Sequence, residues 1–292
     1  MAKQNPIYTV SEETTLLPFL LLSVKGKSRN NIKSMLTRGQ IVVDGKSVTN
    51  HATPLHAGQV VEVRLNVTVG APPMLPILYE DDDLIAVNKP AGMLAISTDK
   101  ERERTAYHIV FDYMKAKKDG GRVFVVHRLD RETSGVMLLA KNEQVKRRLQ
   151  DSWDESVRRR GYIAVVEGCP EPQERTIRSW LRETKTLLVY SSHTEGDGKL
   201  AVTSYTTLRT TAKNTMLDIS LDTGRKNQIR VHMKDIGHPI VGDKKYDAKT
   251  DPLKRLALHA SVLTLLHPIT GDELRLVAPI PPQFVSFMAR NV

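Results

Sequence analysis

Cysteine is almost absent from this sequence, because Cys169 is the single cysteine in 292 residues. An internal disulfide, a CxxC redox pair and a cysteine-based zinc site are therefore excluded. Long hydrophobic runs are missing too. The most apolar N-terminal stretch, residues 16–22, contains Pro18, follows Glu12 and Glu13, and is too short to cross a bilayer or to serve as a signal peptide. These absences favour a reducing compartment, and we expect a cytoplasmic location.

Acidic residues are outnumbered, with 33 Asp and Glu against 43 Lys and Arg, which gives a formal net charge of +10. Such a surplus favours a polyanionic partner, with nucleic acid ahead of an anionic membrane. A basic protein with no such partner is the alternative, and charge alone does not separate the two. Aromatic residues make up only 5% of the chain, so stacking platforms are few and contacts to phosphates and to shape should dominate nucleic-acid recognition.

The first sixty-odd residues have the pattern of a small α/β unit. We expect a helix from about residue 15 and a second one capped by Ser28, with Gly39 at its C-terminal end. Asp44-Gly45 between two short β runs predicts a hairpin turn, and residues 60–65 predict a third strand. The second helix is basic, and we expect three of its cations to contact RNA phosphates: Arg29, Lys33 and Arg38. An ordinary solvated helix face is the alternative.

A proline-rich connector separates this unit from the rest of the chain. We therefore predict an N-terminal domain over residues 13–65, a linker over 66–76 and a larger domain over 77–292. Strand-like runs dominate the larger domain, while helical patterns occur near residues 105–117, 144–153 and 227–236. The predicted fold class is α+β, with a large, mostly antiparallel mixed sheet flanked by helices.

Between Val125 and Asn142, a polar loop that contains Asp130 connects two apolar strand-like runs. A buried sheet rarely presents so many charged groups between two core strands unless a site is built there. The loop sequence is His-Arg-Leu-Asp-Arg-Glu-Thr-Ser-Gly over residues 127–135. In the structural alternative, Asp130 pairs with Arg128 or Arg131, or caps a turn.

A second polar cluster covers residues 222–233, where a strand ends at a glycine turn and a helix begins. Arg225 and Arg230 are both able to reach a neighbouring cleft, and Gln228 and His232 lie four residues apart on one helix face. Exposed backbone N–H groups at such a helix start also favour phosphate. An ordinary basic helix start explains the pattern equally well.

Several short segments stand out in order along the chain. They are Asn-Lys-Pro-Ala-Gly at 88–92, the 127–135 loop, Arg-Gly-Tyr at 160–162, Thr-Gly-Arg and Gln-Ile-Arg-Val-His at 223–232, Gly-His-Pro-Ile-Val-Gly-Asp at 237–243 and Leu-His-Ala at 258–260. Taken together, these segments resemble the RluA/RluD type of pseudouridine synthase. The resemblance covers roughly residues 77–282. The N-terminal unit resembles the S4-like RNA-binding module. Two positions depart from the family pattern: Asn227 stands where His is usual, and Arg160 where Lys is common.

The resemblance implies an RNA pseudouridine synthase that isomerises uridine, with Asp130 as nucleophile, Tyr162 against the uracil and Arg230 paired with Asp130. Arg225 is the less favoured partner for Asp130. Whether Asp130 attacks the ribose, attacks the ring or removes a ribose proton stays open. The reaction has no redox step and no energy input, so neither cofactor nor metal is expected. The residues expected to bind substrate are Arg128, Arg131, Arg225, Asn227, Gln228 and His232, with Arg128 and Arg131 on phosphates.

Two rival functions remain at this stage. The first is a non-catalytic RNA-binding or ribosome-assembly factor, and the second is a glycosidase that releases free uracil. Retention of Asp130, Tyr162 and Arg230 argues against a pure binder. Large-subunit ribosomal RNA is the expected substrate and transfer RNA is the alternative, while the target uridine is not indicated. A monomer is expected, although the sequence does not establish the oligomeric state.

Overall fold

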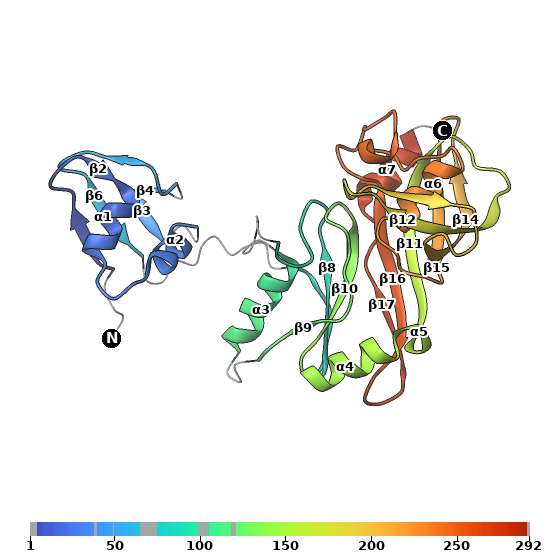
Figure 1. The fold of residues 1–292 in the computed structure, drawn as a ribbon, viewed down its shortest axis with the longest axis horizontal. Helices are drawn as coiled ribbons and strands as arrows, with labels where there is room; N and C mark the ends of the chain where they lie inside the picture. The colour runs from blue at the N-terminus through green and yellow to red at the C-terminus, as the bar shows by residue number, and fades with distance from the viewer. Residues whose placement is uncertain are drawn as a thin grey trace. The chain divides into compact units, whose positions relative to one another are not determined.

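The computed structural model describes residues 5–37, 40–48, 50–64, 75–98, 101, 105–117 and 121–290. The chain forms two compact units, Met1–Met74 and Leu75–Val292, each drawn as a ribbon in Figure 1. Residues 66–74 of the predicted linker lie outside the described residues. No helix of the described residues is long and apolar enough to cross a membrane.

The N-terminal unit pairs two helices with short strands, as its sequence pattern predicts. Its elements are β1 (Ile7–Thr9), β2 (Thr14–Thr15), α1 (Leu16–Ser23), α2 (Arg29–Thr37), β3 (Ile41–Val43), β4 (Lys46–Ser47), β5 (Pro54–Leu55) and β6 (Val60–Val63). The backbone N–H of Asn31 donates to Ser28 Oγ at 3.2 Å, which confirms the predicted N-cap. Asp44 and Gly45 have φ of 47° and 79°, values suited to the tight hairpin turn. The predicted C-terminal glycine, Gly39, lies outside the described residues.

The C-terminal unit is organised around one large sheet. Its strands are β7 (Ile77–Glu80), β8 (Leu84–Lys89), β9 (Phe124–Val125), β10 (Ser134–Ala140), β11 (Val157–Glu167), β12 (Glu174–Glu183), β13 (Val189–Ser192), β14 (Lys199–Thr210), β15 (Asn214–Leu221), β16 (Leu258–Leu266) and β17 (Glu273–Val277). The main order within the described residues is β13-β12-β14-β15-β11-β16-β10-β8-β7, with β17 on β16 and β9 on β10. Only β10 and β16 pair in parallel among these strands. The predicted α+β class with a mostly antiparallel mixed sheet is confirmed.

Helices cover both faces of the first half of the sheet. They are α3 (Ala106–Ala116), α4 (Glu143–Asp151) and α5 (Trp153–Ser156), while α6 (Gln228–Asp235), the short 3-10 helix η1 (Lys244–Tyr246) and α7 (Pro282–Arg290) belong to the second half (Figure 1). On β10, Met137 and Leu139 pack with α3, whereas Val136 and Leu138 pack with α4. Because successive side chains of a strand point to opposite faces, a strand buried on both sides is a continuous apolar run.

The two halves of the sheet meet at Gly135, the second residue of β10. Gly135 has a φ of 119°, and a Cβ at this position would lie 2.1 Å from the carbonyl oxygen of Ala260 on β16. Only glycine permits this approach. The close contact brings the polar loop before β10 beside the central strands β16 and β11.

One long strand was not predicted, namely β12 (Glu174–Glu183). Its residues Ile177, Ser179 and Leu181 are buried. Arg178, which lies between the first two, and Arg182, which follows the last, are exposed. This alternation is the signature of a strand with one open face, but charged residues conceal it. The three helices predicted in this unit are confirmed as α3, α4 and α6, with ends within two residues of the expected ones.

Candidate active site

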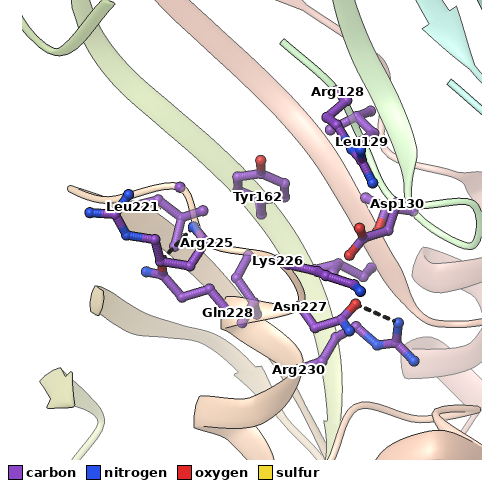
Figure 2. Close-up of a pocket in the computed structure, with 14 residues that line it drawn as sticks. Arg128, Leu129, Asp130, Tyr162, Leu221, Arg225, Lys226, Asn227, Gln228 and Arg230 are labelled. Atoms are coloured by element: carbon purple, nitrogen blue, oxygen red, sulfur yellow. Dashed lines mark hydrogen bonds between the residues drawn. The ribbon is translucent and has the colours of Figure 1, made fainter. Parts of the chain in front are cut away.

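A cavity of about 350 Å³ lies between the loop before β10 and the N-terminal end of α6 (Figure 2). Seven of the predicted catalytic and substrate-binding residues line it: Arg128, Asp130, Tyr162, Arg225, Asn227, Gln228 and Arg230. Residues almost a hundred positions apart in the sequence thus face one space. Arg131 and His232 do not line it.

Asp130 lies on the loop between β9 and β10 and is half-buried. The backbone N–H of Thr133 donates to the Asp130 carbonyl oxygen at 3.2 Å, so the main chain makes a turn at this point. Among the described residues, the Asp130 carboxylate has no hydrogen-bond or ion-pair partner. Arg131 instead forms an ion pair with Glu101 at 2.7 Å. The structural alternative, in which Asp130 pairs with a neighbouring arginine, is therefore not what the structure contains.

Lys89 holds this loop by a hydrogen bond to the Arg131 carbonyl oxygen, a role that was not predicted from the sequence. Its Nζ is fully buried and donates to the carbonyl oxygens of Pro90, Met93 and Arg131 at 3.0, 2.8 and 3.1 Å. Burial lowers the pKa of Lys89 to about 8, although the charges of Glu132 and Asp130 oppose that shift. A lysine at the end of a buried apolar strand is the sequence signal for such a clamp.

Tyr162 enters the cavity from β11 and is half-buried. Burial raises the pKa of its phenol to about 12; the charge of Arg160 opposes this shift and that of Asp130 adds to it. Arg160, one of the two departures from the family pattern, donates from Nε to the carbonyl oxygen of Leu221 at 3.2 Å and from Nη2 to that of Asp222. A planar guanidinium can reach both carbonyls at once, so this departure anchors the loop that follows β15.

The opposite wall of the cavity begins at Asn227, which has a φ of 55° in the left-handed region. Asparagine tolerates that conformation better than most residues. Its Nδ2 donates to the Tyr246 hydroxyl at 3.1 Å, and its Oδ1 accepts from Arg230 Nη1 at 3.0 Å. The second departure from the family pattern therefore holds Arg230 in position.

Arg230 forms its ion pair with Asp243 rather than with Asp130. Its Nε and Nη2 donate to the two carboxylate oxygens of Asp243, each at 2.7 Å, and its guanidinium lies 4.9 Å from the Tyr246 ring centroid. Burial lowers the pKa of Arg230, but the hydrogen bonds and charge of Asp243, with the charge of Asp130 added, raise the pKa on balance. No ion pair within 4 Å joins Arg230 to Asp130 in the described residues, which corrects the expected direct pairing. Asp243 is the last residue of the segment at 237–243, whose sequence does not indicate this ion pair.

Gln228 and His232 support the cavity wall by hydrogen bonds inside the protein. Gln228 Nε2 donates to Val202 O and to Thr203 Oγ1, while its Oε1 accepts from Thr223 Oγ1 and from the backbone N–H of Arg225, all at 2.9–3.0 Å. The ring nitrogens of His232 lie 2.8 Å from Thr203 Oγ1 and 2.9 Å from Ser179 Oγ.

His232 is completely buried, and burial lowers its pKa to about 4. The neutral ring uses both nitrogens on hydroxyl groups of the sheet. Contrary to what is expected of a substrate-binding residue, His232 therefore does not face the cavity. It supports the cavity wall from inside the protein. Spacing of four residues on a helix indicated a shared face, but it did not indicate which way that face points.

All the described residues that line this cavity belong to the C-terminal unit. Arg29 and Lys33 are exposed on α2, whereas Arg38 lies outside the described residues. The described residues contain no group of three His, Cys, Asp or Glu side chains arranged to hold a metal ion.

Comparison with known proteins identifies the class of enzyme to which this site belongs. Residues 83–235 match the family model for RNA pseudouridylate synthase. The chain is 35% identical over 229 residues to ribosomal large subunit pseudouridine synthase D of Xylella fastidiosa, covering 74% of this chain and 69% of that protein. It is 34% identical over 276 residues to the uncharacterized RNA pseudouridine synthase YlyB of Bacillus subtilis, covering 90% and 89%.

A solved structure agrees with these matches. The human RNA Pseudouridylate Synthase Domain Containing 4 structure aligns with a TM-score of 0.61 and 26% identity, over 74% of this chain and 92% of that one. The chain belongs to the RNA pseudouridine synthase family. It is accordingly an isomerase that acts on RNA.

Proposed function

We propose that this enzyme converts specific uridines of large-subunit ribosomal RNA to pseudouridine, with Asp130 as nucleophile and without a cofactor. The observation that carries the proposal is the Asp130 carboxylate, which is half-buried, without a partner among the described residues, and exposed to a cavity shared with Tyr162 and Arg230. A carboxylate suits covalent catalysis when the site fixes its position but no other protein group binds its oxygens. The reaction breaks the bond from ribose to uracil nitrogen 1, rotates the base and rejoins it through carbon 5.

Arg230 supplies fixed positive charge beside Asp130. Three of its five N–H groups are used on Asp243 and Asn227, so two remain for Asp130 or for the substrate. Because Asp243 and the Tyr246 ring hold the guanidinium in place, it need not reorganise when charge develops. Arg230 thus acts as a preorganised electrostatic partner of Asp130 across the cavity, without a direct ion pair in the unliganded protein.

Tyr162 provides a surface for the uracil ring. With a pKa of about 12, its phenol is protonated at neutral pH. It can therefore accept the proton from carbon 5 only with the assistance of another group. In this proposal the ring of Tyr162 lies against the base while the base turns.

The substrate must present an unstacked uridine, because a paired base would keep its reacting atoms inside the helix. The choice of large-subunit ribosomal RNA is supported by relatives named ribosomal large subunit pseudouridine synthase D, with transfer RNA as the alternative. The N-terminal unit is proposed as an S4-like RNA-binding domain that uses Arg29 and Lys33 on phosphates. Arg128 is proposed to contact a phosphate at the cavity. We further propose that the protein acts as a monomer in the cytoplasm.

Pseudouridine mapping of total cellular RNA from a deletion strain tests the proposal directly. Sites that vanish on deletion and return with the wild-type gene, but not with Asp130→Ala, would identify both the activity and the RNA. Assay of free uracil in the same extracts separates isomerisation from glycosidase activity. If Asp130→Ala restored the lost sites, catalysis through Asp130 would be wrong, and if no site changed, the RNA-binding alternative would stand.

A further inference from the structure

A second cavity of about 440 Å³ adjoins the active-site cavity. The two share one wall, made of Gly224, Arg225 and Lys226 on the loop between β15 and α6. The remaining wall comes from β12, β13 and the start of β14. Its volume lies in the range of roughly 300–1,000 Å³ that is typical of ligand sites, so it is large enough for a nucleotide.

The floor of this second cavity is apolar and tightly built. Leu181 and Val189 line it, with exposed fractions of 5% and 4%. Gly198 closes one edge, with a φ of 126°, and a Cβ there would lie 2.6 Å from the carbonyl oxygen of Leu181. The chain therefore passes closely over the end of β12, which only glycine allows.

The rim of the second cavity carries four cations, of which two have no acidic partner. Arg182 pairs with Asp197 at 2.6 Å, and Lys226 pairs with Glu183. Lys199 forms no ion pair among the described residues, and the guanidinium of Arg225 donates there only from Nε, to the carbonyl oxygen of Leu200 at 3.0 Å. Positive charge is thus available from Lys199 in the second cavity and from Arg225 at the junction of the two cavities.

We propose that this second cavity binds the nucleotide adjacent to the target uridine, with its phosphodiester on Lys199 and Arg225 and its base over Leu181 and Val189. The inference rests on the proposed function, which puts the uridine in the neighbouring cavity. RNA fits better than an isolated anion because Arg225 lines both cavities, so one continuous chain can occupy the two sites. The second cavity would then contribute to the choice of uridine by its fit to the flanking base.

The probe for a test is a fluorescein-labelled ten-nucleotide oligouridylate, titrated by anisotropy at several salt concentrations. Lys199→Ala should raise Kd by about tenfold, the value of one charge-assisted hydrogen bond. It should also reduce the slope of log Kd against log salt by about 0.7, as expected for one lost phosphate contact to a single strand. Lys199→Glu should weaken binding further.

Lys213→Ala is the matched control, because Lys213 is also an exposed lysine but lies beyond the opposite end of the twelve-residue strand β14. It should bind as the wild type does. Thermal unfolding of both variants checks that each remains folded. On an unmodified large-subunit ribosomal RNA transcript, Lys199→Ala should raise KM and leave kcat unchanged.

Two failures are distinguishable. If Lys199→Ala keeps the wild-type Kd and salt slope, or Lys213→Ala loses as much affinity, the second cavity binds no phosphate and this inference is wrong even if the enzyme makes pseudouridine. If the wild type binds the probe but modifies no RNA, the proposed function is wrong. The binding data for Lys199→Ala then decide by themselves whether the second cavity binds a phosphodiester.

Discussion

The two walls of the active-site cavity differ in whether their polar side chains have hydrogen-bond partners inside the protein. On the wall formed by the loop before β10 and by β11, Asp130 and the Tyr162 hydroxyl have no hydrogen-bond partner among the described residues. On the α6 wall, the side chains of Asn227, Gln228 and Arg230 are each engaged in two or more hydrogen bonds. The two groups proposed to react are thus without partners, while the polar side chains of the α6 wall are fixed by hydrogen bonds. Substitutions on the two walls should therefore separate activity from stability.

Asp130→Asn should give the largest effect on activity and almost none on folding. Removal of a catalytic group of this kind lowers kcat on the order of 10⁴- to 10⁶-fold. The free energy of unfolding should stay close to that of the wild type, because no side-chain hydrogen bond is lost. Single-turnover kinetics and urea unfolding measure the two quantities. Glu132→Gln, in the same loop, is the control. An equal loss of kcat in that variant would contradict the assignment of Asp130 as the nucleophile.

Asp243→Asn should have the opposite character and destabilise the protein. The carboxylate is completely buried and pairs with Arg230 through two hydrogen bonds. Breaking a buried ion pair by changing one partner costs about 3–5 kcal/mol, measurable by urea unfolding. Asp218→Asn breaks the exposed pair with Arg159 and should cost about 1 kcal/mol or less. Equal losses for the two variants would show that the α6 wall is not held by its ion pair.

Lys89→Met tests the clamp beneath the loop through its pH dependence. The unfolded chain keeps the Lys89 proton up to about pH 10.5, whereas the folded protein releases it near pH 8. The free energy of unfolding of the wild type should therefore rise with pH across this window, by about 3 kcal/mol relative to the variant. Urea unfolding of both proteins at pH 7.5, 9 and 10.5 measures the difference. A constant difference would mean that Lys89 is not buried as a charged group.

Tyr162→Phe should have the smallest effect, about 10²-fold in kcat, because it keeps the ring and removes only the hydroxyl. Stability should hold, since that hydroxyl has no partner among the described residues. With a phenol pKa of about 12, the wild-type rate should show no step from phenol ionisation between pH 6 and 9. A pH–rate profile checks this, and a wild-type step in that range that Phe abolishes would contradict the assignment.

Sequence pattern predicted the helices of the large unit and the polar segments that meet at the cavity, because punctuation and periodicity are local. It failed where a contact partner lies far along the chain. Asp243 holds Arg230, and although Asp243 ends the segment at 237–243, nothing in that segment indicates which side chain its buried carboxylate contacts. The strand β12 was missed because its open face carries arginines, which hide the alternation of Ile177, Ser179 and Leu181.

Residue types in order along the chain were enough to predict the family, the basic character and the candidate site residues Asp130, Tyr162 and Arg230. The three-dimensional contacts were needed to tell which of these polar groups have partners inside the protein. Arg230 is committed to Asp243, His232 faces the interior, and Lys89 supports the loop of Asp130. The physical reason is that pairing and burial depend on distances between segments, and those distances are set by packing of the whole sheet.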